Sequence, residues 1–224
     1  MTVLLRARVF HTPRNPFLEA DALEALDGAL ASGDGRVKAL GPLTELQRRF
    51  PGAPVLGDGQ DYVLPGFVDL HVHYPQVCVV GTMGVTLLEW LETRTLPAEA
   101  RLADADVARA TAARFLQGLA RNGTTTALVF GAHQAPAQGA FFELAARSGL
   151  RITSGLVLGD RLLRPELETT PEAAFADSET LLKTWHGHGR LRYAVTPRFS
   201  LSCTEGLLEA AGALVKRYPD ALFQ

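Results

Sequence analysis

The sequence predicts an α/β fold in two parts. Residues 1–62 are expected to form a small β-rich element, and residues 63–224 the first half of a (β/α)8 barrel, truncated at its fifth strand. After Pro65, strand-like and helix-like patterns alternate with short connections, which is typical of right-handed βαβ units and a parallel sheet. Five strands can be counted there, the fifth barely begun, whereas a complete barrel needs eight strands and usually about 250 residues.

Short strands separated by glycine turns predict the β-rich element. These strands are Val3–Phe10, Val37–Leu40 and Val55–Leu56. Between them, Ala20–Leu30 carries apolar residues three and four positions apart, and Leu43–Phe50 is expected to form a helical turn or two. These segments carry no visible chemical motif, so we expect the element to be a scaffold.

The first barrel strand follows Pro65 and ends at Tyr74. Apolar residues occupy every second position in it, namely Val68, Leu70 and Val72. Because side chains alternate across a strand, Asp69, His71 and His73 are expected to share the other face. At a rise of roughly 3.3 Å per residue, the two imidazoles start about 7 Å apart, within reach of one shared ion.

The later elements follow from apolar periodicity. Strands are expected at Thr124–Phe130, Arg151–Leu158, Leu191–Val195 and, just beginning, Ala221–Phe223. Helices are expected at Leu87–Leu96, at Asp104–Arg121, before Gly149, at Ser178–Trp185, and after Ser202, which has capping-box spacing to Glu205. Parallel strands of this kind place their exits at one edge, where loops gather and ligands bind.

The two histidines of the first barrel strand allow more than one interpretation. A His-x-His pair can consist of hydrogen-bonded core or surface residues. Here both rings belong to the polar face of an apolar strand, and burying two imidazoles without partners costs too much to expect. A bound cation would give both rings a partner, and Asp69 could supply the carboxylate that orients a metal-bound ring.

Composition argues against several classes of partner. Of the 224 residues 47% are hydrophobic and 21% are charged, which suits a buried parallel sheet. The formal net charge of -2 offers no general attraction to nucleic acid. Met1–Phe10 has no continuous apolar run, so we expect no signal peptide, no membrane span and a cytoplasmic protein. Cys78 and Cys203 are too few for a disulfide framework and are expected to be reduced structural thiols.

Several short motifs, taken in order, resemble a known family. Pro65-Gly66-Phe67-Val68-Asp69-x-His71-x-His73 is similar to the first-strand signature of the amidohydrolase superfamily, and the extension Tyr74-Pro75-Gln76 resembles its guanine deaminase branch. Further matches are Leu87-Leu88-Glu89-Trp90-Leu91, Pro97-Ala98-Glu99, Asn122-Gly123-Thr124-Thr125-Thr126 and Val195-Thr196-Pro197-Arg198-Phe199-Ser200. Each motif is short, but together they span most of the chain after Pro65 in the family's order and spacing.

The resemblance implies a metal-dependent hydrolase barrel that deaminates guanine to xanthine and ammonia, in purine catabolism. It implies that His71 and His73 bind the metal, which we expect to be zinc, although imidazole ligands also suit iron. The next metal-binding histidine is expected just beyond Gln224, on the fifth strand. The catalytic acid/base residue is not identifiable here and is expected shortly after that ligand. A homodimer is also implied, with no interface indicated.

The resemblance assigns substrate binding to Gln76, Arg198 and Phe199. The Gln76 amide both donates and accepts, which suits the mixed donors and acceptors of a purine edge. Arg198 can donate to a ring carbonyl, and Phe199 can cover the purine face. Without the resemblance, Gln76 would be a surface residue, and the Arg-Phe pair would be packing plus solvent contact.

Other polar residues have simpler explanations beside the functional one. His133 either lines the pocket or lies in an exposed loop, and Asp160 and Arg161 either match a family pair or form a loop salt bridge. Trp90 either walls the site or packs on an apolar helix face. A second His-x-His, in which glycines flank His188, is expected to be a solvated loop.

Two rival functions remain open from the sequence. One is another amidohydrolase acting on a different aminated ring, such as an s-triazine or a pyrimidine. The other is a truncated, non-catalytic product that binds metal poorly, since two histidines alone rarely hold zinc in a stable tetrahedral site.

Overall fold

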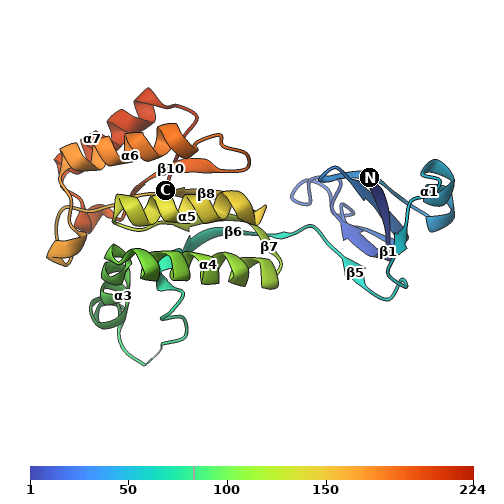
Figure 1. Ribbon diagram of the computed structural model, residues 1–224, viewed down its shortest axis with the longest axis horizontal. Coiled ribbons are helices and arrows are strands. Elements are labelled where there is room, and N and C mark those ends of the chain that lie inside the picture. The colour runs from blue at the N-terminus through green and yellow to red at the C-terminus, as the bar shows by residue number, and fades with distance from the viewer. Residues whose placement is uncertain (83) are drawn as a thin grey trace. The chain divides into compact units, whose positions relative to one another are not determined.

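The computed structural model describes residues 1–82 and 84–224, and it divides into two compact units (Figure 1). The first unit is Met1–Gly66 and the second is Phe67–Gln224. The boundary therefore follows Gly66, a few residues later than the boundary after Tyr62 that the sequence suggests.

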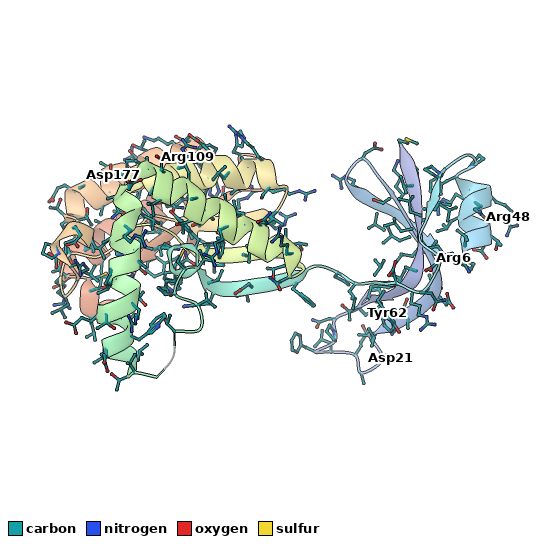
Figure 2. The ribbon with its side chains drawn as sticks, turned by 60° about the horizontal axis from the view of Figure 1, so that its bottom comes forward. Arg6, Asp21, Arg48, Tyr62, Arg109 and Asp177 are labelled. Carbon is teal, nitrogen blue, oxygen red and sulfur yellow. The ribbon has the colours of Figure 1, made fainter. Side chains whose placement is uncertain are left out.

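The first unit is a mixed sheet with one helix. Its strands are β1 (Thr2–His11), β2 (Glu24–Gly33), β3 (Arg36–Gly41), β4 (Val55–Leu56) and β5 (Tyr62–Val63), and its helix is α1 (Leu43–Arg49). The strand order is β3-β2-β1-β4, and β5 also pairs with β1. Helix α1 contributes Leu46 to a small core that contains Leu4 and Ala31. In Figure 2, Arg48 marks this helix and Tyr62 marks β5, where the Tyr62 hydroxyl accepts a hydrogen bond from Arg8.

The helix-like spacing of residues 20–30 is overridden by strand pairing. Glu24–Gly33 pairs with β1 along its whole length in antiparallel register. Asp34 and Gly35 then connect β2 to β3 with φ values of 55° and 70°, the backbone of a two-residue hairpin turn. Such a turn fixes the register of both strands, so the long ladder decides the structure of this segment.

The second unit is a parallel half-barrel. Its strands are β6 (Phe67–His73), β7 (Thr124–Phe130), β8 (Arg151–Gly155), β9 (Val157–Leu158), β10 (Arg192–Pro197) and β11 (Leu222–Phe223). The order is β11-β10-β8-β7-β6, with β9 paired to β10, and every pair is parallel. All strand exits therefore lie at one edge, which we call the carboxyl edge.

Helices connect these strands and cover one face of the sheet, as α4 to α7 do in Figure 1. The α-helices are α2 (Leu87–Trp90), α3 (Leu96–Ala100), α4 (Ala105–Arg121), α5 (Ala135–Ser148), α6 (Pro171–Trp185) and α7 (Glu205–Arg217). A π-helical turn, η2 (Leu91–Thr95), joins α2 to α3, and 3-10 turns lie at η1 (Tyr74–Gln76), η3 (Arg101–Ala103), η4 (Pro165–Leu167) and η5 (Ser200–Ser202). None of the described helices combines the length and the apolar character needed to cross a bilayer.

Local signals explain the helix boundaries. The Asp104 side chain accepts the backbone N–H groups of Asp106 and Val107, which caps α4, and Gly149 ends α5 with a φ of 74°. The expected capping box at Ser202 is wrong. Thr204 is the cap of α7, and its hydroxyl accepts the N–H of Leu207.

The main core lies between the helices and the sheet, and it includes the predicted α4 stripe of Ala108, Ala112, Phe115 and Leu119. The apolar face predicted for the first barrel strand is only partly buried. Val72 packs against the core, whereas Val68 and Leu70 are 59% and 70% exposed. The reason is that β6 is the last strand in the sheet order, with β7 as its one neighbour among the described residues.

Candidate metal and ligand site at the carboxyl edge

His71 and His73 converge at the end of β6. Their Nε2 atoms lie 3.4 Å apart and their ring centroids 5.3 Å apart. Alternation along the strand puts both side chains on one face, and their rotamers bring the ring nitrogens together. The predicted convergence of the two rings is therefore present in the structure.

This separation fits two ligands of one tetrahedral ion. Zinc binds imidazole nitrogens at about 2.0–2.1 Å, so two nitrogens at tetrahedral corners lie about 3.3–3.4 Å apart. Burial is the main reason why the pKa of His73 is lowered to about 4; the Glu99 charge opposes this shift, and the charges of Arg198, His71 and His133 add to it. The His73 ring is thus neutral near pH 7, which is the form that binds metal. The described residues contain no cluster of three or more potential ligands, so for a tetrahedral ion this pair would supply only two of the four ligands.

Phe130, the last residue of β7, packs against both imidazoles. Its ring stacks on His73 with centroids 4.3 Å apart and an interplanar angle of 12°, and it lies 4.8 Å from His71 at 42°. Because Phe130 is itself buried, this contact restricts how far the two rings can turn.

Asp69 acts on the backbone rather than on a ring. Its Oδ1 accepts the backbone N–H of His71 at 3.0 Å. The pairing of β6 with β7 is irregular between Asp69 and Val72, so the strand ladder is interrupted where this side chain takes over. The expectation that Asp69 orients a metal-bound imidazole is therefore not met; its contact shapes the strand that carries His71.

A second, buried cluster forms around Glu99 of α3. Gln76 donates from Nε2 to Glu99 Oε1 at 2.9 Å, and Arg198 donates from Nη1 to Glu99 Oε2 at 2.6 Å. His133 Nε2 lies 3.1 Å from the same Oε2, and His133 Nδ1 lies 3.1 Å from the carbonyl of Leu167. The side chains of Glu99 and His133 are each 2% exposed, and that of Arg198 is 7% exposed. One carboxylate thus joins groups that follow β6, β7 and β10.

The Glu99 carboxylate is ionised. Burial alone would raise the pKa of Glu99, but the hydrogen bond with His133, the charges of Arg198 and His133, and the Gln76 amide together lower it to about 2. A buried charge paired and hydrogen-bonded in this way is stable, whereas removal of one partner leaves an uncompensated charge.

The loop that carries Arg198 and Phe199 is fixed by the segment after β9. Arg161 donates from Nε to the Leu201 carbonyl and from Nη2 to the Ser200 carbonyl, each at 3.1 Å. Asp160 accepts the Thr204 backbone N–H at 2.7 Å and also bonds the Thr204 hydroxyl. The two residues therefore brace the loop and form no salt bridge with each other. Phe199 is 42% exposed at this edge.

The structure also places the remaining candidates. His133 is not an exposed loop residue but part of the Glu99 cluster. Trp90 donates from its indole Nε1 to the Thr82 hydroxyl at 2.8 Å, which is a structural contact. In the second His-x-His, His186 Nδ1 accepts the Tyr193 backbone N–H at 3.1 Å and His188 meets the Trp185 ring edge-on, so this pair holds a loop in place.

Sequence reasoning gave Glu99 no role. It stands within the Pro97-Ala98-Glu99 motif, on a five-residue helix that is too short to give a periodic signal. The one available clue was a carboxylate inside a family-like motif, and its partners come from segments that only the fold brings together.

Known proteins resemble this chain in sequence and in fold. A family model described as "Amidohydrolase family" matches residues 62–224. The chain belongs to the amidohydrolase family. This amidohydrolase chain is 54% identical over 226 residues to a "Probable guanine deaminase" of Deinococcus radiodurans, covering 98% of this chain and 52% of that protein.

Solved structures agree with the fold. Escherichia coli guanine deaminase superposes with a TM-score of 0.90 at 36% identity, covering 100% of this chain and 52% of that one. Guanine deaminase from Bradyrhizobium japonicum gives a TM-score of 0.90 at 33% identity, covering 99% and 49%. The predicted α/β class and partial barrel are thereby confirmed. The amidohydrolase chain spans about half the length of the curated relatives it matches.

Proposed function

We propose that the full-length protein containing this chain is a guanine deaminase, which hydrolyses guanine to xanthine and ammonia. The observation that carries the proposal is the 3.4 Å approach of the His71 and His73 Nε2 atoms at the carboxyl edge. Relatives and solved structures that are 36–54% identical to the chain are named guanine deaminases, which supports this substrate over other aminated rings.

His71 and His73 would hold a divalent ion, and we propose zinc, with iron as the alternative that the same ligands allow. When bound, such an ion lowers the pKa of a coordinated water toward about 7 and so makes hydroxide available near neutral pH. The contribution of this chain to the metal site would be two imidazoles whose nitrogen lone pairs are free to bind the ion. Phe130 limits the rotation of both rings, and Asp69 fixes the backbone between them.

Gln76, Arg198 and Phe199 would bind the purine. Gln76 lies three residues after His73, in η1, and Arg198 and Phe199 directly follow β10, so all three belong to the carboxyl edge. Arg198 offers N–H donors to a ring carbonyl, the Gln76 amide matches a neighbouring ring group, and the partly exposed Phe199 ring can cover a purine face.

The residue that transfers protons during deamination lies outside the groups assigned to this chain. Glu99 is unsuited to that task, because its Oε1 already accepts a hydrogen bond from Gln76 and its Oε2 accepts one from Arg198. We propose, as the family resemblance implies, that the acid/base group lies beyond Gln224 in the full-length protein.

Ammonia release tests the proposal directly. The full-length, metal-loaded protein is assayed with guanine, adenine, cytosine and ammeline. Guanine is expected to be the best substrate by kcat/KM. Faster release from ammeline or cytosine would instead assign a triazine or pyrimidine deaminase, and absence of guanine turnover would defeat the proposal.

The non-catalytic alternative needs a separate measurement. Intact-mass analysis of the natural protein shows whether residues follow Gln224, and metal analysis of the same sample shows whether the ion is held. A protein of 224 residues without metal would support a non-catalytic product.

We also propose that the protein is a cytoplasmic homodimer that acts in purine catabolism. Bacterial relatives named as guanine deaminases support the metabolic role, and the family resemblance is the basis for the dimer. Light scattering after size-exclusion chromatography should give twice the mass of one full-length chain, and a monomer mass would exclude the dimer.

A further inference from the structure

We propose that Glu99 is a positioning residue that fixes the Gln76 amide in one orientation and thereby selects rings that carry a carbonyl beside a ring N–H. The inference rests on the proposed function, because it concerns the same ligand site. It assigns a role to a buried carboxylate that contacts none of the reacting atoms itself.

The orientation of the Gln76 amide follows from the chemistry of its partner. An ionised carboxylate only accepts hydrogen bonds, and Glu99 Oε1 lies 2.9 Å from the Gln76 amide. The Gln76 NH2 group must therefore face Glu99, since the flipped amide would place its oxygen against a carboxylate oxygen. No other described side chain or backbone N–H donates to Gln76 Oε1, so this carbonyl oxygen is the acceptor left for a ligand.

Arg198 is fixed by the other oxygen of the same carboxylate. Its Nη1 donates to Glu99 Oε2 at 2.6 Å, which leaves Nε and Nη2 as donors for a ligand. The ligand therefore meets an acceptor from Gln76 and donors from Arg198. A lactam edge, with a ring carbonyl and an adjacent ring N–H, complements both groups. An amidine edge, with an amino group and a bare ring nitrogen, opposes both.

The Glu99 carboxylate is itself held in one orientation. His133 approaches Oε2 through Nε2 and is anchored on its far side by the Leu167 carbonyl, with each contact at 3.1 Å. Because the Glu99 side chain is 2% exposed, it cannot turn toward the ligand and must act through Gln76 and Arg198. The π-helical turn Leu91–Thr95 directly precedes the helix that presents Glu99, a feature often found at functional sites.

The test compares two substrates that differ only at this edge. Guanine carries the lactam edge, and 2,6-diaminopurine keeps the same 2-amino group but carries the amidine edge. The full-length, metal-loaded wild type should prefer guanine strongly by kcat/KM. In Glu99→Gln, the new amide can donate or accept, so Gln76 can flip and the guanine preference should fall by about tenfold or more.

A matched control separates this effect from the loss of any carboxylate. Glu143 of α5 pairs with Arg109 of α4 at 3.0 Å on the outer surface of the helices, where Figure 2 labels Arg109. Glu143→Gln should keep the wild-type preference. If Glu99→Gln does not yield folded protein, Glu99→Asp keeps the negative charge but withdraws it from the Gln76 amide, and the same direction of change is expected.

The outcomes distinguish this inference from the proposed function. A wild type without guanine turnover defeats the proposed function. If the wild type is active, a folded Glu99→Gln that retains the wild-type preference overturns the positioning role. An equal loss of both substrates in that variant also overturns it, because a merely structural role would lower both alike.

Discussion

The second unit contains two His-x-His pairs with the same spacing and different structures. His71 and His73 lie on a strand, where alternation puts both side chains on one face and their Nε2 atoms come within 3.4 Å. His186 and His188 lie at the end of α6 and in the loop after it, where one ring accepts a backbone N–H and the other meets an indole edge. Identical spacing thus brings two ring nitrogens together only where the backbone is extended, and here the strand exit at the carboxyl edge makes that pair the proposed metal site.

The largest effect is expected from removal of one histidine of the first pair. His73→Ala leaves His71 as the one imidazole that this pair offers to the ion, so we expect loss of bound metal and a fall in guanine turnover of about a thousandfold or more. Metal content and ammonia release of the full-length protein measure this. His188→Ala is the matched control and should leave both values within about twofold of wild type. Equal effects at His73 and His188 would contradict the distinction between the pairs.

The aromatic support of the first pair predicts the next effect. Phe130 is 7% exposed and contacts both imidazoles, so Phe130→Ala should lower the free energy of unfolding by about 3–5 kcal/mol and weaken metal binding. Urea denaturation and metal titration of the full-length protein measure the two changes. Phe17→Ala, at a residue that is 95% exposed, should stay within about 0.5 kcal/mol of wild type. An unchanged free energy of unfolding in Phe130→Ala would show that the Phe130 ring does not stabilise the fold around the two imidazoles.

The buried Glu99 carboxylate should make the free energy of unfolding fall as the pH is lowered. The pKa of Glu99 is about 2 in the folded protein and 4.5 for an ordinary glutamate, so between these pH values the unfolded chain binds more protons than the folded one. The contribution of Glu99 to stability is therefore complete above about pH 4.5 and is lost as the pH falls toward 2, by up to about 3 kcal/mol.

Metal-free wild type and Glu99→Gln are compared by denaturation at pH 5, 4 and 3. The free energy of unfolding should fall more steeply in the wild type than in Glu99→Gln, and Glu143→Gln should follow the wild type. Parallel curves for wild type and Glu99→Gln would contradict the pKa shift.

The smallest effect is expected at the second pair. His186→Ala removes the acceptor of the Tyr193 backbone N–H, which should cost about 1 kcal/mol of unfolding free energy without any change in bound metal. Thermal denaturation and metal analysis measure these. A loss of metal in His186→Ala would show that His186 and His188, rather than His71 and His73, bind the ion.

Much of the second unit was predictable because its signals are local. The α4 stripe from Ala108 to Leu119 and the β7 run Thr124–Phe130 depend on periodicity alone, and the structure confirms both. The convergence of His71 and His73 followed from strand alternation. By contrast, residues 20–30 have a helix-like apolar spacing, but from Glu24 onward they belong to strand β2, because the Asp34-Gly35 turn and pairing with β1 outweigh that spacing.

The rest of the site depends on contacts between distant segments. Glu99 contacts Gln76, His133 and Arg198 only because α3 lies close to three strand exits. The periodicity of the sequence does not predict this convergence. Asp69 was expected to orient a ring, but a local irregularity in the β6 ladder gave it a backbone partner instead. The exposure of Val68 and Leu70 likewise reflects the position of β6 in the sheet, which composition does not encode.

The central claim is that His71 and His73 jointly bind one metal ion, and anomalous X-ray diffraction from the metal-loaded, full-length protein tests it most directly. The account predicts a single anomalous peak with the Nε2 atoms of both residues about 2.0–2.1 Å away. A peak bonded to neither histidine, or a fully loaded protein in which the two rings point apart, would contradict it.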